Sequence, residues 1–131
     1  MILTPEELVR VRAQAEAEYP AECCGVLLAR AAPVPDRALM PCRNIQDELH
    51  AQDPVRHPRN SRTAYFIDPK DLLAIGRRES QGYRLATIYH SHVDTGAYFT
   101  QTSSVIAQIR HITVIRAMNA SWTTCRCLYH P

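Results

Sequence analysis

The sequence predicts an α/β fold in which a mixed β-sheet is flanked by helices. Helix start signals occur at residues 4–7 and again at residues 68–69. Apolar runs typical of buried strands follow at residues 21–29 and 84–88. With 46% hydrophobic residues, a chain of 131 residues is long enough to build one core. We therefore expect residues 1–131 to form a single domain.

The first helix is expected from residue 5 to about residue 18. Thr4 can cap its first turn, and Glu7 completes a capping box. A proline two residues beyond ends the helix, because proline lacks the amide N–H that would continue it. The apolar strand over residues 21–29 follows directly, with Glu22 at its entrance.

Two further strands are expected on either side of a long loop. Residues 38–40 open a second strand, which Pro41 interrupts. Residues 42–62 are polar and carry two prolines, so they read as a loop with room for one helical turn. Loops of this length inside a compact domain are usually functional or mobile. Residues 63–67 read as a third strand.

The second helix is expected from residue 69 to about residue 80, with Asp68 as its cap and Gly82 as its stop. It leads into a strand that ends in His90-Ser91-His92. Residues i and i+2 of a strand point to the same face, roughly 6–7 Å apart, so both imidazoles can converge on one ion. Read alone, such a pair is as often exposed surface. A catalytic zinc site also needs a third protein ligand and a general base.

Residues 101–131 differ from the rest of the chain. All 13 acidic residues lie at or before Asp94, and arginine outnumbers lysine 14 to 1. A shifted reading frame or divergence would each explain this change. Apolar spacing over residues 102–118 suits a helix, although β-branched residues permit a strand at 112–115. A further strand is expected within residues 121–129.

Composition excludes two classes of partner. The net charge is +2 and the 15 cationic side chains are scattered, so we expect no binding of nucleic acid. No apolar run approaches the ~18 residues of a membrane span and no signal-peptide pattern occurs, so we expect a cytoplasmic location and no membrane contact. Five cysteines, an odd number, fit free thiols better than disulfides. The two-thiolate clip that Cys125 and Cys127 could form lacks a second pair.

Several dispersed blocks together resemble the bacterial branch of the JAMM (MPN-plus, Mov34/JAB-like) metalloprotease family. They are residues 19–28, Asn44, residues 65–69, residues 90–92 and residues 96–99. The blocks occur in the family's order over about the first hundred residues. The resemblance implies an MPN/JAMM-like fold, which is similar to that of cytidine deaminases.

The same resemblance implies the roles of individual residues. Glu22 would be the general acid/base that takes a proton from the attacking water, with His90 and His92 as zinc ligands. The family has a serine eight positions and an aspartate eleven positions after the second histidine, which correspond here to Thr100 and Ser103. The Thr100 hydroxyl would still help a developing oxyanion. The neutral Ser103 cannot replace a carboxylate ligand, so zinc is expected to bind weakly or not at all.

Three readings of function follow. The resemblance implies a zinc-dependent metallopeptidase or isopeptidase, a hydrolase acting on the Gly-Gly tails of ubiquitin-like or sulfur-carrier proteins. The alternative is a catalytically silent MPN-type module that binds such a partner. A third reading is thiol chemistry at Cys23 or Cys24 with a histidine partner. Asp94 lies immediately beyond the histidines in a tight stretch, which makes it a weak candidate to replace the missing carboxylate ligand. The sequence leaves the oligomeric state open.

Overall fold

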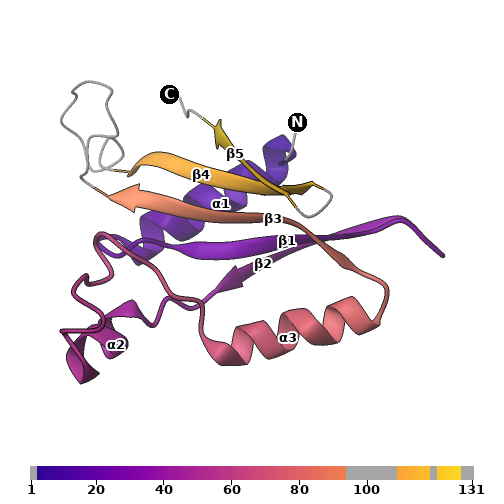
Figure 1. Cartoon of the computed structure of the whole chain (residues 1–131). Helices are drawn as coiled ribbons and strands as arrows, with labels where there is room; N and C mark the ends of the chain where they lie inside the picture. The colour runs from indigo at the N-terminus through magenta and orange to yellow at the C-terminus, as the bar shows by residue number, and fades with distance from the viewer. Residues whose placement is uncertain (1–2, 94–108, 119–120, 128–131) are drawn as a thin grey trace.

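The structure, a computed structural model shown in Figure 1, describes residues 3–93, 109–118 and 121–127, with side chains described as far as residue 92. Five strands form one sheet in the order β2-β1-β3-β4-β5. The strands are β1 (Cys24–Arg30), β2 (Asp36–Cys42), β3 (Arg84–Val93), β4 (Ile109–Met118) and β5 (Ser121–Cys127). The helices are α1 (Pro5–Glu18), α2 (Gln46–Gln52) and α3 (Pro69–Ser80).

The expected α/β class is confirmed, but every described strand pair is antiparallel, so the sheet is not mixed. β2 and β3 run in the same direction, and α2 and α3 lie in the connection between them. β1 lies between these two strands and runs opposite to both. The helical connection therefore joins two parallel strands, β2 and β3, that β1 separates in the sheet.

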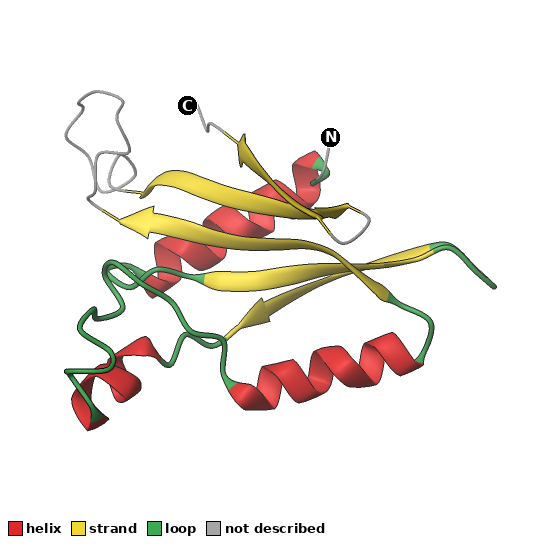
Figure 2. Ribbon diagram, in the orientation of Figure 1, coloured by secondary structure: helices red, strands yellow, loops and turns green. Residues whose placement is uncertain are grey.

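Helices cover both faces of the sheet, as Figures 1 and 2 show. On one face, α1 buries Val11 and Ala15 in a cluster with Leu27 of β1. On the other face, α3 buries Ile75 in a cluster with Val26 of β1. Because successive side chains of a strand point to opposite faces, β1 contributes to both layers of the core.

The two helices with strong start signals have the expected bounds. At α1, the Glu7 N–H donates to Thr4 Oγ1 at 3.2 Å and the Thr4 N–H donates to Glu7 Oε2 at 2.8 Å, which completes the capping box. At α3, Asp68 accepts from the Lys70 N–H at 2.9 Å, and Gly82 follows the helix with φ of 91°. Within the described residues, no helix combines the length and apolar character needed to cross a membrane.

Several sequence expectations for residues 21–67 are corrected. β1 begins at Cys24, three residues later than expected. Residues 63–67 make one isolated bridge instead of a strand, because the Asn44 side chain accepts from the Phe66 N–H where a neighbouring strand would. The long loop contains α2, which is seven residues long. β2 continues through Pro41. Proline is tolerated there because β2 is an edge strand of the described sheet, and no described strand on its outer side needs an N–H donor.

The described part of the tail is strand. β4 occupies residues 109–118, for which the sequence allowed either helix or strand, and the β-branched residues there favour the strand. β5 confirms the strand expected after residue 121 and ends at Cys127. The single domain over residues 1–131, with residues 101–131 divergent from the family pattern, stays a prediction.

Candidate functional site

His90 and His92 lie at the end of β3 with their imidazole rings next to each other. Their Nε2 atoms are 3.0 Å apart, and the ring centroids are 4.9 Å apart. Side chains at i and i+2 of a strand share a face, so this convergence is the one that the sequence predicts. It follows from the local strand geometry alone.

His90 is partly buried. Burial, with a smaller contribution from His92, lowers the pKa of His90 to about 4, so its ring is neutral at neutral pH. The Tyr65 ring stacks on the His90 ring, with centroids 4.5 Å apart and planes inclined by 27°. The His90 Nδ1 atom is buried and has no hydrogen-bond partner among the residues that the structure describes. Neutral imidazole is the form that binds a metal ion.

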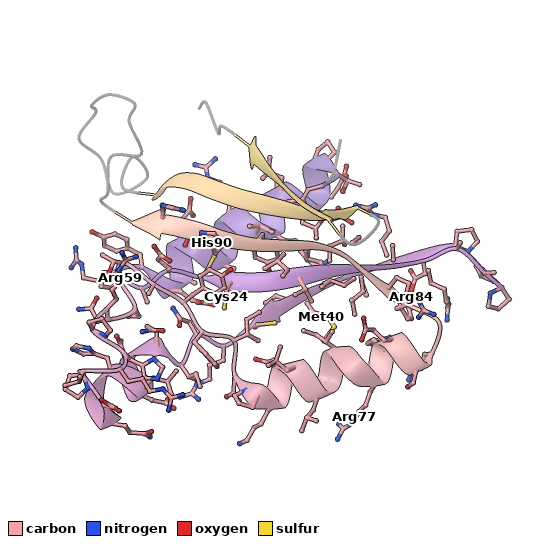
Figure 3. All side chains as sticks on the ribbon, in the orientation of Figure 1. Cys24, Met40, Arg59, Arg77, Arg84 and His90 are labelled. Atoms are coloured by element: carbon pink, nitrogen blue, oxygen red, sulfur yellow. The ribbon has the colours of Figure 1, made fainter. Side chains whose placement is uncertain are left out.

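Glu22 lies two residues before β1, in a segment where pairing with β3 continues past the end of the strand. Cys24 pairs with His90, and these side chains lie at the same end of the sheet in Figure 3. The Ser91 N–H donates to the Cys23 carbonyl at 3.0 Å, and the Cys23 N–H donates to Ser91 Oγ at 2.8 Å. Alternation along the chain then places Glu22 on the same face as Cys24 and both histidines.

The Glu22 carboxyl group is suited to proton transfer. The residue is only 4% exposed, and burial raises its pKa to about 7 against the opposing charge of Arg59. Arg59 lies at the same end of the sheet as His90 (Figure 3). The pKa of Tyr65 is raised mainly by burial and further by the nearby Cys24 and Glu22. A carboxyl group that is half ionised near neutral pH can both accept and return a proton.

The long loop fixes the backbone of Glu22. The Glu22 N–H donates to the Ser61 carbonyl at 2.7 Å, and the Glu22 carbonyl accepts from Asn44 Nδ2 at 2.9 Å. Ser61 is itself held by Asp47, which accepts from its N–H and its hydroxyl at 2.7 Å each. Sequence reasoning missed the roles of Asn44, Ser61 and Tyr65. Asn44 and Tyr65 stood out only as members of family-like blocks, and Ser61 gave no signal.

The histidine pair fits two ligands of one metal ion. Zinc–nitrogen bonds of 2.0–2.1 Å at a tetrahedral angle place two ligand atoms about 3.3 Å apart, close to the 3.0 Å between the two Nε2 atoms. Within the described residues, no group of three or more His, Cys, Asp or Glu side chains is placed to hold a metal. Thr100, Ser103 and Asp94 lie outside the described residues. The third ligand position therefore stays a prediction.

Among the residues whose side chains are described, the cysteines Cys23, Cys24 and Cys42 are free and buried. Burial raises the pKa of Cys23 to about 11 and that of Cys42 to about 12, and it raises the pKa of Cys24 as well. Thiol chemistry requires the thiolate form, which burial disfavours. The reading based on a nucleophilic Cys23 or Cys24 therefore loses support.

Comparison with known proteins gives one match. The family model that describes prokaryotic homologs of the JAB domain matches residues 5–123. No curated protein and no solved structure matches the chain. The matched span includes the histidine pair, Glu22 and the loop that fixes the backbone of Glu22.

Proposed function

Because the chain belongs to the prokaryotic homologs of the JAB domain, we propose that it is a metal-dependent peptidase or isopeptidase of the JAMM (MPN-plus) type. One observation carries the proposal: the 3.0 Å approach of the His90 and His92 Nε2 atoms, on the sheet face that Glu22 shares. A histidine pair and a buried carboxyl group are parts that metal-assisted amide hydrolysis requires.

His90 and His92 would hold a zinc ion. Zinc, when bound in such a site, polarises a carbonyl group and lowers the pKa of water. Glu22, with a pKa of about 7, would accept a proton from the attacking water and return it to the leaving amine. The Thr100 hydroxyl as oxyanion donor and Ser103 at the third ligand position belong to this proposal through the family spacing alone. The neutral Ser103 makes the proposed zinc site a weak one.

The proposed substrates are ubiquitin-like or sulfur-carrier proteins with a C-terminal Gly-Gly tail, cleaved at the peptide or isopeptide bond after that tail. The resemblance described above is the support for this substrate class. A cytoplasmic location belongs to the same proposal, because free, buried cysteines suit a reducing compartment.

A second candidate function is a catalytically silent MPN-type module that binds such a tail. One observation favours it: a serine occupies position 103, where the family has an aspartate. In that case the fold would remain while hydrolysis would be absent.

Zinc titration and a cleavage assay on a sulfur carrier with a C-terminal extension test the two functions together. The peptidase proposal expects wild-type zinc binding that His90→Ala and His92→Ala each weaken by at least about tenfold. Glu22→Gln should keep zinc binding and lose cleavage, because an amide cannot accept the proton. Binding of the carrier tail without any cleavage in excess zinc would support the silent module. Zinc binding that is unaffected by both histidine substitutions would overturn the peptidase proposal.

A further inference from the structure

The side chain of Asn44 uses its full hydrogen-bonding capacity at the site. Its Nδ2 group donates to the carbonyls of Glu22 at 2.9 Å and Ala64 at 3.2 Å. Its Oδ1 atom accepts from the N–H groups of Gln46 and Phe66, each at 3.0 Å. An amide has two donor hydrogens and two acceptor lone pairs, so no capacity is left over. One side chain thus connects the entrance of β1, the start of α2 and the segment before α3.

Two of these four bonds enclose Tyr65. The Ala64 carbonyl precedes it and the Phe66 N–H follows it, so Asn44 fixes the backbone on both sides of Tyr65. The ring that this backbone carries stacks on His90, with centroids 4.5 Å apart. Asn44 therefore acts on the orientation of His90 through one intervening aromatic ring.

Stacking on Tyr65 is one of the contacts that orient the His90 ring. A metal-binding histidine ordinarily donates its outer ring N–H to a carboxylate or a carbonyl, which fixes the ring. In the described part of the chain, the buried Nδ1 of His90 has no such partner. Its described ring contacts are with Tyr65 and His92, and they include the 3.0 Å approach of the His90 and His92 Nε2 atoms.

The remaining Asn44 donor acts on the proposed base. The Glu22 carbonyl accepts from Asn44, while its N–H donates to the Ser61 carbonyl at 2.7 Å. Both polar groups of the Glu22 backbone are thereby fixed, so the Glu22 side chain extends from a backbone of defined position. Reacting groups lose activity when they are misplaced by about 1 Å.

From this geometry we propose that Asn44 is the positioning residue of the site, setting Glu22 directly and His90 through the Tyr65 ring. The inference rests on the proposed function, which supplies the reason for placing these two groups relative to each other. Asn44 touches neither the substrate nor the metal in this role.

Metal affinity tests the proposal without a catalytic assay. Cobalt(II) would be titrated into the full-length wild type and variants, with its visible absorption reporting the ligand geometry. Asn44→Asp keeps the two acceptor bonds but loses both donors, and Tyr65→Leu keeps apolar volume but loses the stacked ring. Each is expected to weaken cobalt binding by about 10- to 100-fold, as loss of an outer-shell partner does. Tyr65→Phe keeps the ring and should bind as the wild type does.

A second measurement separates failure of this inference from failure of the proposed function. In the metal-free protein, NMR signals of the His90 ring carry the ring-current shift of the stacked Tyr65. Asn44→Asp and Tyr65→Leu should remove that shift, whereas Tyr65→Phe and the surface control Asn60→Ala should keep it. If the wild type binds no cobalt but the shifts behave in this way, the positioning role stands and the peptidase proposal falls. If Asn44→Asp, folded by circular dichroism, keeps the His90 shift, the positioning role is overturned.

Discussion

The hydroxyl group of Tyr89 lies directly over Gly25 and occupies the space that a β-carbon at residue 25 would fill. Tyr89 is fully buried, and its hydroxyl donates to Gln14 Oε1 at 2.7 Å, so the ring cannot move aside without losing this bond. Gly25 adjoins Cys24, and Tyr89 adjoins His90. The contact therefore sets the spacing of β1 and β3 beside the candidate site.

Gly25→Ala should lower the free energy of unfolding by about 1–3 kcal/mol, the usual cost of an extra methyl group in a packed core. Urea unfolding followed by circular dichroism measures it. Gly76→Ala is the matched control, because a β-carbon there meets no atom within 4 Å and the residue lies in α3. That control should stabilise the protein by about 0.5–1 kcal/mol through helix propensity. Equal effects of the two substitutions would contradict the contact.

An ion pair between Glu7 and Arg37 connects α1 to the edge strand β2. Arg37 Nε and Nη2 donate to Glu7 Oε1 and Oε2, each at 2.7 Å, and this pairing lowers the pKa of Glu7. A lowered folded-state pKa contributes stability that is present above the unfolded value, about 4.3, and is lost as pH falls through the folded value. Glu7→Gln keeps a capping-box side chain but loses the ion pair. We expect it to cost about 0.5–1 kcal/mol at pH 7, because Arg37 is partly exposed.

The pH dependence identifies the ion pair as the cause. The difference in unfolding free energy between wild type and Glu7→Gln should shrink as the pH falls below the ordinary glutamate value of about 4.3 and through the lowered pKa of Glu7. Glu6→Gln, which removes the same kind of charge from the first turn, serves as the control. A difference that persists unchanged at low pH would show that the ion pair is not its source.

Glu22 should destabilise the folded protein when it is ionised. Its folded-state pKa is raised from 4.5 to about 7. The contribution of protonated Glu22 to the free energy of unfolding is therefore fully present below about pH 4.5 and is lost as the pH rises through about 7. Glu22→Gln removes this loss and should be more stable than wild type at pH 8, by up to about 3 kcal/mol. Thermal unfolding across pH 4–8 would measure the gain. A gain independent of pH would contradict the raised pKa.

The features predicted correctly from the sequence are those that interactions between residues close in the chain determine. The caps at Thr4 and Asp68 gave the bounds of α1 and α3, and the i, i+2 spacing gave the convergence of His90 and His92. The error at residues 63–67 has a non-local cause, because their partner is a side chain about twenty residues away. The continuation of β2 through proline likewise depends on its place at the edge of the sheet.

The candidate site also combines features that local sequence signals predict with features that depend on non-local contacts. The sequence could point to Glu22, but its burial and raised pKa come from packing that no local pattern records. The stacking of Tyr65 on His90 joins segments 25 residues apart in the chain. Such contacts need the tertiary structure.

The third ligand position gives the most direct test of the family assignment at the level of the site. Ser103→Asp should strengthen zinc binding by at least about tenfold, on the order of 1.4 kcal/mol, because it adds an anionic oxygen to a site that otherwise offers imidazole nitrogens. Isothermal titration with zinc measures the change. Ser104→Asp adds the same charge one position away and should leave zinc affinity nearly unchanged. Equal gains at both positions would indicate general electrostatic attraction and not a ligand.

The repaired protein also separates metal binding from proton transfer. Adding Glu22→Gln to Ser103→Asp should preserve the gained zinc affinity and abolish hydrolysis of a Gly-Gly-tailed carrier, because the amide cannot accept a proton from water. If Ser103→Asp leaves the zinc affinity unchanged, position 103 does not face the histidine pair. The chain would then have the MPN-like fold with a histidine pair and a buried glutamate but no complete metal site, which favours the binding-module function.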